Sequence, residues 1–486
     1  MIGREKEFKE LTRLYNRNRA DLVAIYGRRR VGKTFLVDET FGTRITFRHA
    51  GLSPTDQQPE GMLCAQLEHF YRSLKEQGMK NPEKPSSWMD AFYQLECFLK
   101  QKDSGKRQLV FLDEIPWMDT PRSGFVQAFE GFWNNWACHR KNIMVIVCGS
   151  ANSWILDHLI NNHGGLYNRV TYEIKLSPLS LRECEQLFKE NGVRFSRYDV
   201  AQSYMIFGGI PYYLGYIDDE LSLAQNVDRL FFDGSARLAN EFVRLFDSIF
   251  DDSEMARNTI RLLYTRNAGF TRKEIIEKLH LSNGSRISKV LHALTAGDFV
   301  IRYVPFGMSK REAHYKLTDP FCLFWLHFVE GNSGFAEDYW QQRVTSQPVA
   351  VWRGYAFENL CFNHIPQIKR ALGISGVITT ASAWSKRTDD QEGTQIDLLL
   401  SRNDNVVNMC ELKYYGSDFT VDLNYYKNIL HRQELLLKEI SPKYAVYSTL
   451  ITTYGLKHNE YAGAFLKVIT LDCKTAEYLS QSRKLI

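Results

Sequence analysis

The residues best suited to chemistry form a glycine-rich loop near the amino terminus. The segment GRRRVGKT, residues 27–34, follows the apolar run LVAIY and precedes the helical pattern FLVDE. Its glycines allow backbone N–H groups to surround phosphate oxygens, while Lys33 reaches the β- and γ-phosphates and the Thr34 hydroxyl ligates Mg²⁺. The sequence therefore predicts a site for ATP and Mg²⁺ along this loop, formed by Gly27, Arg28, Arg29, Arg30, Val31, Gly32, Lys33, Thr34 and Phe35.

A second chemical element is the acidic pair in the apolar run LVFLDEI, residues 109–115. At the tip of a strand, Asp113 is expected to hold Mg²⁺, largely through water molecules. Glu114 is expected to orient and polarise the water that attacks the γ-phosphate. An acidic turn after a strand is common on its own, so this prediction depends on the loop described above. Together the two segments predict an ATPase whose catalytic residues include Lys33 and Glu114.

Three further polar residues are candidates for contact with the γ-phosphate. Ser150 and Asn152 come at the end of the run IMVIVCGS and just after it, and Arg169 lies in GGLYNR. A polar side chain on a neighbouring strand can sense this phosphate, and an arginine can stabilise it as an arginine finger. The same residues fit structural roles equally well, as strand caps or as an ion-pair partner. Arg169 is expected to act either within its own subunit or across a homo-oligomer formed by the ATPase domain.

The elements that position these residues are short apolar runs alternating with amphipathic segments. Strands alternating with helices are typical of a parallel sheet that is covered on both faces. The expected strands are residues 22–26, 44–48, 108–112, 142–148 and 171–176, and the expected helices are residues 33–40, 61–77 and 124–137.

Composition is typical of a folded protein from a reducing compartment. The 486 residues are 44% hydrophobic and carry a formal net charge of +5, which suits several domains and permits a local basic surface. Nine cysteines without a CxxC pair argue against a disulfide framework or a zinc ribbon. The start MIGREKEFKEL does not resemble a signal peptide, and the apolar run at 321–329 is far shorter than the roughly twenty residues of a membrane span. We therefore expect a cytoplasmic protein that does not enter a membrane.

Several segments together resemble the archaeal-type ATPase family, a group of AAA-related, STAND-like signal-transduction NTPases. These segments are IGREKEF, GRRRVGKT, LVFLDEI, CGS, GGLYNR and GGIPYYL. The resemblance implies that Gly3, Arg4 and Glu5 lie at the adenine end of the nucleotide. It also implies that Pro211, in GGIPYYL, marks the start of a helical lid. From the residues alone, the GRE segment also fits the cap of a helix.

A middle module follows, in which three helical patterns at 254–264, 272–279 and 285–296 precede two short strands, 299–304 and 313–317. This order predicts a winged helix-turn-helix. Its basic residues could contact DNA phosphates. The alternative is a packing arm that responds to the nucleotide, as in similar ATPases. The candidate contacts are Arg286, Lys289 and His292 on the third helix and Lys310 and Arg311 in the hairpin.

The carboxy-terminal part contains a second group of chemically capable residues. Glu358 lies in the helical pattern WRGYAFENLCFNHI, Asp397 in the strand pattern TQIDLLL, and Glu411 and Lys413 in NMCELKY. Because side chains alternate along a strand, the last two point to the same face. Carboxylates are ligands for Mg²⁺, and a nearby lysine can position or help deprotonate a water. The expected roles are metal binding for the three acids and catalysis for Asp397, Glu411 and Lys413.

This constellation resembles the PD-(D/E)xK nuclease superfamily, and so does the αβββαβ order of elements from 349 to 448. The expected elements are a long helix at 349–372, strands at 376–383, 394–401 and 405–414, a helix at 423–440 and a strand at 443–448. One departure is that Gln395 and Ile396, instead of a proline, precede Asp397. The resemblance implies either Mg²⁺-dependent cleavage of phosphodiesters or a non-catalytic binding module.

The sequence as a whole predicts an α/β protein with an AAA-like P-loop NTPase domain, a helical lid, a winged-helix domain and a restriction-endonuclease-like α/β domain. The expected boundaries are 1–206 for the ATPase core, 207–253 for the lid, 254–330 for the winged helix, 331–347 for a linker and 348–486 for the nuclease-like domain. The favoured function is an ATPase that acts on nucleic acid, DNA more than RNA. The alternative is a nucleotide-dependent switch or scaffold.

Overall fold

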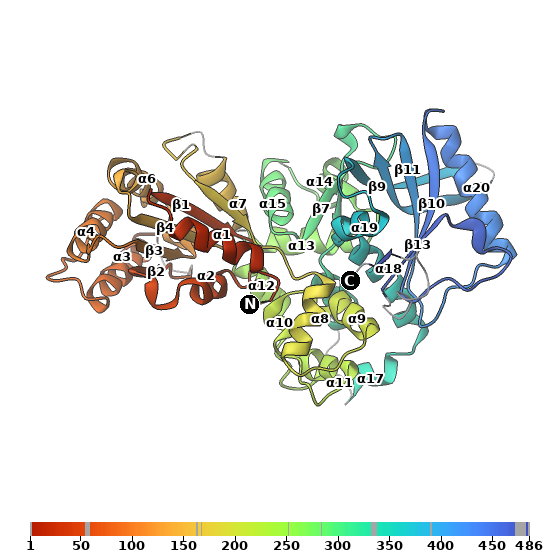
Figure 1. The fold of residues 1–486 in the computed structure, drawn as a ribbon, viewed down its shortest axis with the longest axis horizontal. Helices are drawn as coiled ribbons and strands as arrows, with labels where there is room; N and C mark the ends of the chain where they lie inside the picture. The colour runs from red at the N-terminus through yellow and green to blue at the C-terminus, as the bar shows by residue number, and fades with distance from the viewer. Residues whose placement is uncertain are drawn as a thin grey trace. The chain divides into compact units, whose positions relative to one another are not determined.

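The alternation of strands and helices near the amino terminus produces a parallel sheet in the computed structural model of the chain (Figure 1). The structure describes residues 2–53, 59–161, 164–166, 168–250, 252–282, 284–331, 338–388, 391–471 and 483–484. The first sheet has five strands in the order β2-β3-β4-β1-β5, and all its pairs are parallel. Its strands are β1 (Asp21–Tyr26), β2 (Phe47–Ala50), β3 (Gln108–Asp113), β4 (Ile143–Gly149) and β5 (Tyr172–Lys175).

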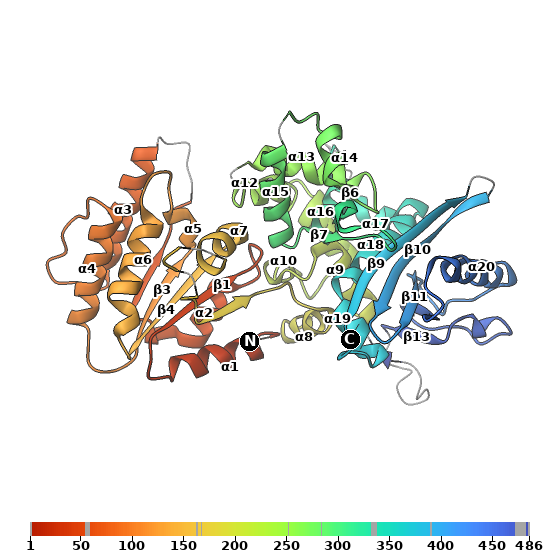
Figure 2. The same cartoon turned by 90° about the horizontal axis from the view of Figure 1, so that it is seen from above.

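Helices cover both faces of this sheet, as expected for central strands in which every residue is buried. Figure 2 shows α3, α4 and α6 on one face, where they pack against alternate residues of β1, namely Leu22, Ala24 and Tyr26. The helical segments of this region are α1 (Glu5–Tyr15), α2 (Lys33–Phe41), η1 (Gly42–Arg44), α3 (Pro59–Glu76), α4 (Trp88–Gln101), α5 (Ile115–Met118), α6 (Phe125–Asn135), η2 (Ala137–His139), α7 (Asn152–Ile155) and η3 (Leu156–Ile160).

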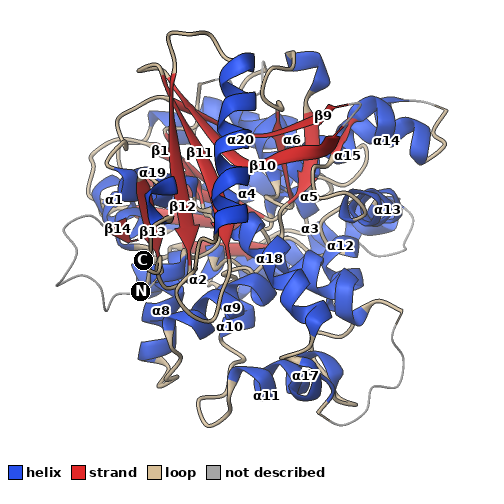
Figure 3. Cartoon of the chain, turned by 90° about the vertical axis from the view of Figure 1, so that its right-hand side faces the viewer, coloured by secondary structure: helices blue, strands red, loops and turns tan. Residues whose placement is uncertain are grey.

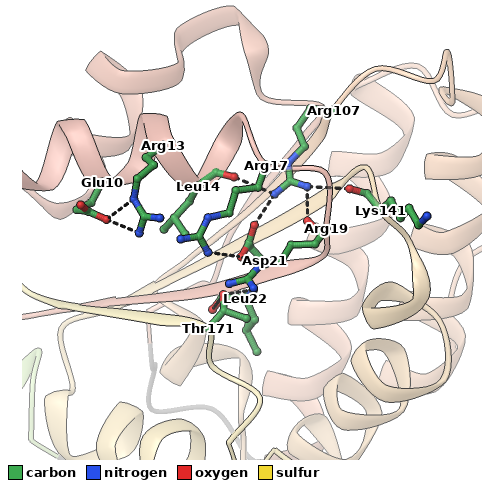
Figure 4. A network of polar contacts seen from close by, with 10 residues as sticks. All are labelled: Glu10, Arg13, Leu14, Arg17, Arg19, Asp21, Leu22, Arg107, Lys141 and Thr171. Carbon is green, nitrogen blue, oxygen red and sulfur yellow. Dashed lines mark hydrogen bonds and ion pairs between the residues drawn. The ribbon is translucent and has the colours of Figure 1, made fainter.

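A buried charge network joins the amino ends of the strands (Figure 4). Asp21, at the start of β1, is fully buried, and its Oδ2 accepts a hydrogen bond of 2.8 Å from Nη2 of Arg107. Arg17 and Arg19 lie 3.6 and 3.5 Å from the other carboxylate oxygen. The Arg107 guanidinium also donates to the main-chain carbonyls of Leu14, Arg19 and Lys141. One arginine therefore connects α1, β1 and β3 with the segment that precedes β4.

The chain divides into two compact units. Unit 1 is Met1–Pro178 with Arg244–Ser253 and His292–Asp298, and unit 2 is Leu179–Val243 with Glu254–Leu291 and Phe299–Ile486. Unit 2 contains a small antiparallel sheet in the order β6-β8-β7, made of β6 (Phe270–Thr271), β7 (Val300–Tyr303) and β8 (His314–Leu317). The helices α8 and α9 belong to unit 2, so the boundary predicted at residue 206 lies inside this unit.

Many helical segments follow β5, and several of them are short. The first of them are α8 (Leu181–Glu190), α9 (Arg197–Phe207), α10 (Pro211–Leu214), α11 (Leu223–Val227), η4 (Asp228–Phe232) and α12 (Glu241–Asp247). Next come α13 (Ser253–Tyr264), α14 (Arg272–Lys278), α15 (Gly284–Ala296), η5 (Lys310–Glu312), α16 (Pro320–Phe324) and η6 (Trp325–Val329). The three predicted helices of the middle module correspond to α13, α14 and α15, and its hairpin to β7 and β8.

A six-stranded mixed sheet follows in the order β14-β13-β12-β11-β10-β9. Strand β10 pairs antiparallel with both β9 and β11, and β11, β12, β13 and β14 pair in parallel. Figure 3 shows α20 alongside these strands. The elements are α17 (Tyr339–Arg343), α18 (Gln347–Asn363), α19 (Ile365–Leu372), β9 (Thr379–Thr388), β10 (Gln391–Arg402), β11 (Val406–Lys413), α20 (Leu423–Glu439), β12 (Ala445–Thr452), η7 (Ala462–Ala464), β13 (Lys467–Thr470) and β14 (Arg483–Lys484).

Two expectations for this region need correction. The single helix predicted over 349–372 is broken at His364, since Pro366 in the first turn of α19 has no N–H with which to continue the preceding helix. The segment predicted as a linker, 331–347, contains α17, and its Trp340 is only 2% exposed. The backbone N–H of Trp340 donates to Asp228 Oδ1 at 2.6 Å, so the described part of this segment packs within unit 2. Residues 332–337 lie outside the described residues.

No helix within the described ranges is long and apolar enough to cross a membrane.

Candidate functional site

The order of the first sheet brings the predicted phosphate-binding residues together. Strand β4 lies between β1 and β3, and all three strands run in the same direction. Their carboxyl ends are therefore neighbours, with Gly27 directly after β1, Glu114 directly after β3 and Ser150 directly after β4. Residues separated by more than one hundred positions in the sequence thus line one edge of the sheet.

The loop backbone requires glycine at its first position. Gly27 has φ +151°, and a Cβ added there would lie 2.1 Å from the carbonyl oxygen of Leu176. Gly32, the N-cap of α2, adopts a left-handed conformation with φ 93°. Arg30 also has a positive φ, of 73°. The loop therefore folds back on itself before α2 begins, as a phosphate-binding loop does.

Lys33 is held inside this loop, with a side chain that is only 5% exposed. Its Nζ donates to the carbonyl oxygens of Gly27 at 3.0 Å and Arg28 at 3.2 Å and to Ser150 Oγ at 3.1 Å. Burial lowers the pKa of this ammonium group, while the nearby Glu114 opposes the shift. A buried cation that is satisfied by only three neutral oxygens has a strong preference for an anionic ligand.

Thr34 and Asp113 form the part of the site that suits Mg²⁺. The Thr34 hydroxyl donates to Asp113 Oδ2 at 2.7 Å. Burial raises the pKa of Asp113, and the hydrogen bond from Thr34 partly offsets this effect. A divalent cation beside these two oxygens would favour the ionised carboxylate. Hard oxygen donors of this kind, supplemented by phosphate and water oxygens, are what Mg²⁺ prefers. The residues therefore fit the predicted metal.

Glu114 is fixed by the end of the neighbouring strand. Its Oε1 accepts a hydrogen bond of 2.6 Å from Ser150 Oγ, and its Oε2 accepts one of 2.9 Å from the Ser150 backbone N–H. Its own backbone is left-handed, with φ 45° and ψ 47°. Such a conformation costs a non-glycine residue about 1–2 kcal/mol, and at a catalytic position this strain is commonly retained because it directs the side chain. Ser150 thus contacts both Lys33 and Glu114.

Asn152 and Arg4 form hydrogen bonds with the backbone of the phosphate-binding loop. Asn152 Oδ1 accepts a hydrogen bond of 2.8 Å from the Gly27 N–H, and its Nδ2 donates to the Ala296 carbonyl at 2.9 Å. Arg4, which is 8% exposed, donates through Nη2 to the carbonyl oxygens of Val31 at 3.2 Å and Ser177 at 2.8 Å. Both residues support the loop backbone, a role that the sequence left open for Asn152 and did not predict for Arg4.

The other predicted residues occupy varied positions. Arg28 is buried, Phe35 is 56% exposed, and the Arg29 guanidinium lies 5.7 Å from the centre of the Trp117 ring. Gly3 has a positive φ of 65° just before α1. Arg169 is exposed in the segment that precedes β5. Pro211 begins α10 in unit 2. The assignments of Arg28, Arg29, Gly3, Arg169 and Pro211 to the nucleotide remain predictions.

The carboxy-terminal residues form a second polar cluster, within unit 2. Glu411, at 3% exposure, accepts hydrogen bonds from the Tyr425 hydroxyl at 2.6 Å and from Arg432 Nη1 at 2.9 and 3.1 Å. Lys413 Nζ lies 3.1 Å from the same carboxylate. Burial would raise the pKa of Glu411, but Lys413 and Arg432 outweigh it and lower this pKa. Glu411 is therefore an ionised carboxylate that is already paired with two cations.

The buried carboxyl groups of Glu358 and Asp397 are less well compensated by nearby cations. Burial, and then the charge of Asp397, raises the pKa of Glu358 to about 7. Burial, and then Glu411, raises the pKa of Asp397 to about 6. The Gln395 side chain donates to Asp397 Oδ1 at 3.2 Å, and Asn267 Nδ2 donates to Glu358 Oε2 at 2.6 Å. The charges of Glu358, Asp397 and Glu411 thus influence one another.

Four residues of this cluster were not predicted from the sequence. Tyr425 and Arg432 lie on the same face of α20, two helical turns apart. Asn267 and Lys316 come from the middle module. In the sequence, Lys316 stands out only as a lysine within the short strand pattern HYKL. Throughout the described ranges, no three His, Cys, Asp or Glu residues are grouped so that they could hold a metal ion. In this arrangement Glu358, Asp397 and Glu411 therefore do not fit a Mg²⁺ site, and their predicted roles remain predictions.

Comparison with known proteins finds similarity to ATPases. Residues 1–217 match a family described as an ATPase domain predominantly from Archaea. An uncharacterised protein of Methanocaldococcus jannaschii is 21% identical over 460 residues, covering 92% of this chain and 94% of that protein. The Walker-type ATPase of Pyrococcus abyssi is 17% identical, covers 67% of this chain and 96% of its own, and has a TM-score of 0.45. The ORC2 protein of Aeropyrum pernix, in ADPNP and ADP complexes, is 14% identical and covers 67% of this chain and 93% of its own, with a TM-score of 0.38.

Proposed function

We propose that this protein uses ATP hydrolysis to control an action on nucleic acid. The match of residues 1–217 to an ATPase domain found predominantly in Archaea supports the first part of this proposal. The observation that supports the ATP-dependent part is the convergence of Lys33, Thr34, Asp113, Glu114 and Ser150 at one edge of the first sheet. The action on nucleic acid is assigned to the middle module, which lies in unit 2 apart from His292–Asp298, and to the carboxy-terminal sheet of unit 2.

In the proposed reaction, the loop amides and Lys33 bind the phosphates, and Lys33 exchanges its contacts with loop carbonyls for phosphate oxygens. Thr34 and Asp113 would hold Mg²⁺, which supplies charge neutralisation for the β- and γ-phosphates. Glu114 orients the attacking water and accepts its proton. Ser150, bonded to both Lys33 and Glu114, keeps the carboxylate at a fixed distance from the lysine. The exposed position of Arg169 suits a phosphate contact within its own subunit or in a second copy.

The proposal for nucleic acid rests on two features of unit 2. The first is the element order of the broken helix α18–α19, then β9, β10, β11, α20 and β12. It resembles the αβββαβ order of PD-(D/E)xK nucleases and brings Asp397, Glu411 and Lys413 close together. The second is the exposure of Arg286, Lys289, Lys310 and Arg311 on α15 and the hairpin, which suits phosphate contacts of a winged helix with DNA.

The described cysteines form no disulfide, as suits action in the cytoplasm.

One observation favours a second candidate function. The carboxylate of Glu411 is already saturated by Tyr425, Arg432 and Lys413. A saturated carboxylate is a poor metal ligand, so the carboxy-terminal domain is equally suited to recognising a partner without cleaving it. In that case the protein is a nucleotide-dependent switch or scaffold.

A cleavage assay separates these functions. The purified chain and its Lys33→Ala and Lys413→Ala variants are incubated with labelled DNA and RNA, with Mg²⁺ or Mn²⁺, and with or without ATP. The proposed function predicts products that disappear in Lys413→Ala. Loss in Lys33→Ala as well shows that ATP licenses the cut. Absence of cleavage in every sample, beside measurable ATP hydrolysis, contradicts the nuclease and selects the switch.

A further inference from the structure

The phosphate-binding loop carries a second cation close to Lys33. The Arg29 guanidinium lies 5.7 Å from the centre of the Trp117 ring, and its Nη1 is buried without a hydrogen-bond partner in the described part of the chain. Burial is the main cause that lowers the pKa of Lys33, and the positive charge of Arg29 acts in the same direction, so the two cations lie within electrostatic reach of each other. Two neighbouring cations, one of which has an unpartnered buried donor, favour an anionic ligand.

The aromatic partner of Arg29 is held in place through its backbone. Trp117 belongs to the short helix α5, which begins directly after Glu114, and its N–H donates to the Glu114 carbonyl at 3.0 Å. The Trp117 carbonyl accepts a hydrogen bond of 2.7 Å from Nε2 of Gln66, a residue that is only 3% exposed. A Cβ added to Gly51 would lie 3.1 Å from the Trp117 Cβ, so the chain after β2 also packs closely against this residue. The ring that Arg29 contacts is therefore fixed relative to Glu114.

The surroundings of Arg29 indicate which phosphate it serves. In the proposed reaction, Glu114 orients the water that attacks the γ-phosphate, and Lys33 reaches the β- and γ-phosphates. Arg29 influences the charge of Lys33 and stacks on the residue three positions after Glu114. Both groups that act on the γ-phosphate are thus its neighbours.

An arginine suits this position better than a lysine. The planar guanidinium can stack on an aromatic ring through its face and still donate hydrogen bonds in its plane. Its bonds to phosphate are charge-assisted and can be bidentate. In phosphoryl transfer, an arginine that neutralises the transition-state charge raises the rate of hydrolysis by about 10³–10⁵, whether it comes from the same chain or from another protein.

We propose that Arg29 is a catalytic residue for ATP hydrolysis, which binds the γ-phosphate from within the loop, and that Trp117 is the positioning residue that holds its guanidinium there. This inference rests on the proposed ATPase function. It explains why a buried donor of the loop lacks a partner beside Lys33. It also supplies, from the loop itself, the charge that the sequence indicated as an arginine finger only at Arg169.

The test compares nucleotide binding and hydrolysis in the full-length chain and its variants. Binding of ADP and of the non-hydrolysable analogue ADPNP is measured by titration calorimetry with Mg²⁺, and kcat by steady-state ATP hydrolysis. Arg29→Gln is expected to weaken ADPNP binding at least about tenfold, to leave ADP binding within about twofold, and to lower kcat at least about a hundredfold. Retained ADP binding shows that the variant is folded. Arg29→Lys keeps the charge without the planar donors, and its kcat is expected to fall between those of the parent and Arg29→Gln.

Tryptophan variants test the positioning role. Trp117→Phe retains an aromatic face and should keep kcat within about threefold of the parent, whereas Trp117→Leu, which is apolar but has no such face, should lower kcat at least about tenfold. Trp136→Leu is the matched control, because Arg140 lies 5.1 Å from the Trp136 ring in the segment that leads into the amino end of β4. This control should hydrolyse ATP as the parent does.

Parental kcat in Arg29→Gln, or an equal loss of ADP and ADPNP affinity in that variant, would overturn the catalytic assignment of Arg29. Equal kcat in Trp117→Phe and Trp117→Leu would overturn the positioning role of Trp117. In each of these results the parent still binds and hydrolyses ATP. They are therefore distinct from a failure of the proposed ATPase function, in which the parent itself shows no hydrolysis.

Discussion

At the scale of single residues, Ser150 is the centre of the ATP site. Its hydroxyl accepts from Lys33 Nζ at 3.1 Å and donates to Glu114 Oε1 at 2.6 Å, and its backbone N–H bonds the other oxygen of Glu114. Lys33, which we propose binds phosphate, and Glu114, which we propose activates water, are therefore joined through one hydroxyl group. A change at Ser150 should alter the chemical step more than the binding of ATP.

We predict that Ser150→Ala lowers kcat for ATP hydrolysis by about tenfold to a hundredfold, as loss of one positioning hydrogen bond at a catalytic group commonly does. The Kd for ATP should change by only a few-fold, since Lys33 and the loop amides remain. The measurement is steady-state hydrolysis together with nucleotide binding. Ser177→Ala is the matched control, because Ser177 contributes its carbonyl, not its hydroxyl, to Arg4. An unchanged kcat in Ser150→Ala would contradict the role assigned here.

The candidate residues of the proposed ATP site could be identified from sequence because their spacing and flanking patterns are local. The hydrogen-bond partners of those residues could not be predicted from sequence. Asn152 was a candidate for phosphate contact, yet it bonds the N–H of Gly27, and only the register between β1 and β4 reveals this. Lys316 and Glu358 are separated by more than forty positions, so no local pattern relates them. Their proximity depends on how β8 packs against α18.

At the scale of elements, the position of β4 between β1 and β3 organises the site, and the network around Asp21 secures these strands at their opposite ends (Figure 4). Six residues of extended chain, about 20 Å, separate Asp21 from the end of β1. The network should therefore affect the stability of the sheet without directly affecting the chemistry of the ATP site.

Arg107→Ala is expected to destabilise unit 1 by about 3–5 kcal/mol, because it leaves the buried carboxylate of Asp21 without its closest cation and removes the guanidinium that donates to three carbonyl groups. The measurement is denaturant unfolding followed by tryptophan fluorescence. The folded variant should retain the parental affinity for ATP. Arg13→Ala is the control, since Arg13 forms an exposed pair with Glu10 in the same region. If the two variants unfold at the same denaturant concentration, the network has no such role.

Element types were predictable wherever the period of apolar residues was clear, as in β1, β3, β4 and α20. The helix expected over 349–372 was wrong in one respect, its break at His364, although Pro366 was visible in the sequence. A proline within an apolar helical pattern either kinks or ends the helix, and tertiary packing decides between them. Here His364 accepts from the Leu181 N–H through Nε2 at 3.2 Å and bonds the Leu360 carbonyl through Nδ1 at 2.9 Å, which fixes the break.

At the scale of the whole molecule, the chain combines an ATPase unit with a second unit in which several predicted modules pack together. The match to the ATPase family covers residues 1–217, while the relative from Methanocaldococcus jannaschii extends over 92% of the chain. Boundaries at 206 and 331–347 were predicted from changes in the strand and helix pattern along the sequence, which do not reveal that α8, α9 and α17 pack within unit 2. Side-chain packing between distant segments sets these boundaries.

The most direct test of the account is a comparison of ATP binding and ATP hydrolysis in the parent, Lys33→Ala and Glu114→Gln. If Glu114 activates water while Lys33 holds the phosphates, as we propose, Glu114→Gln should bind ATP as tightly as the parent but hydrolyse it at least about a hundredfold more slowly. Lys33→Ala should lose both properties. Hydrolysis at the parental rate in Glu114→Gln, or tight ATP binding in Lys33→Ala, would contradict the assignment of the ATP site.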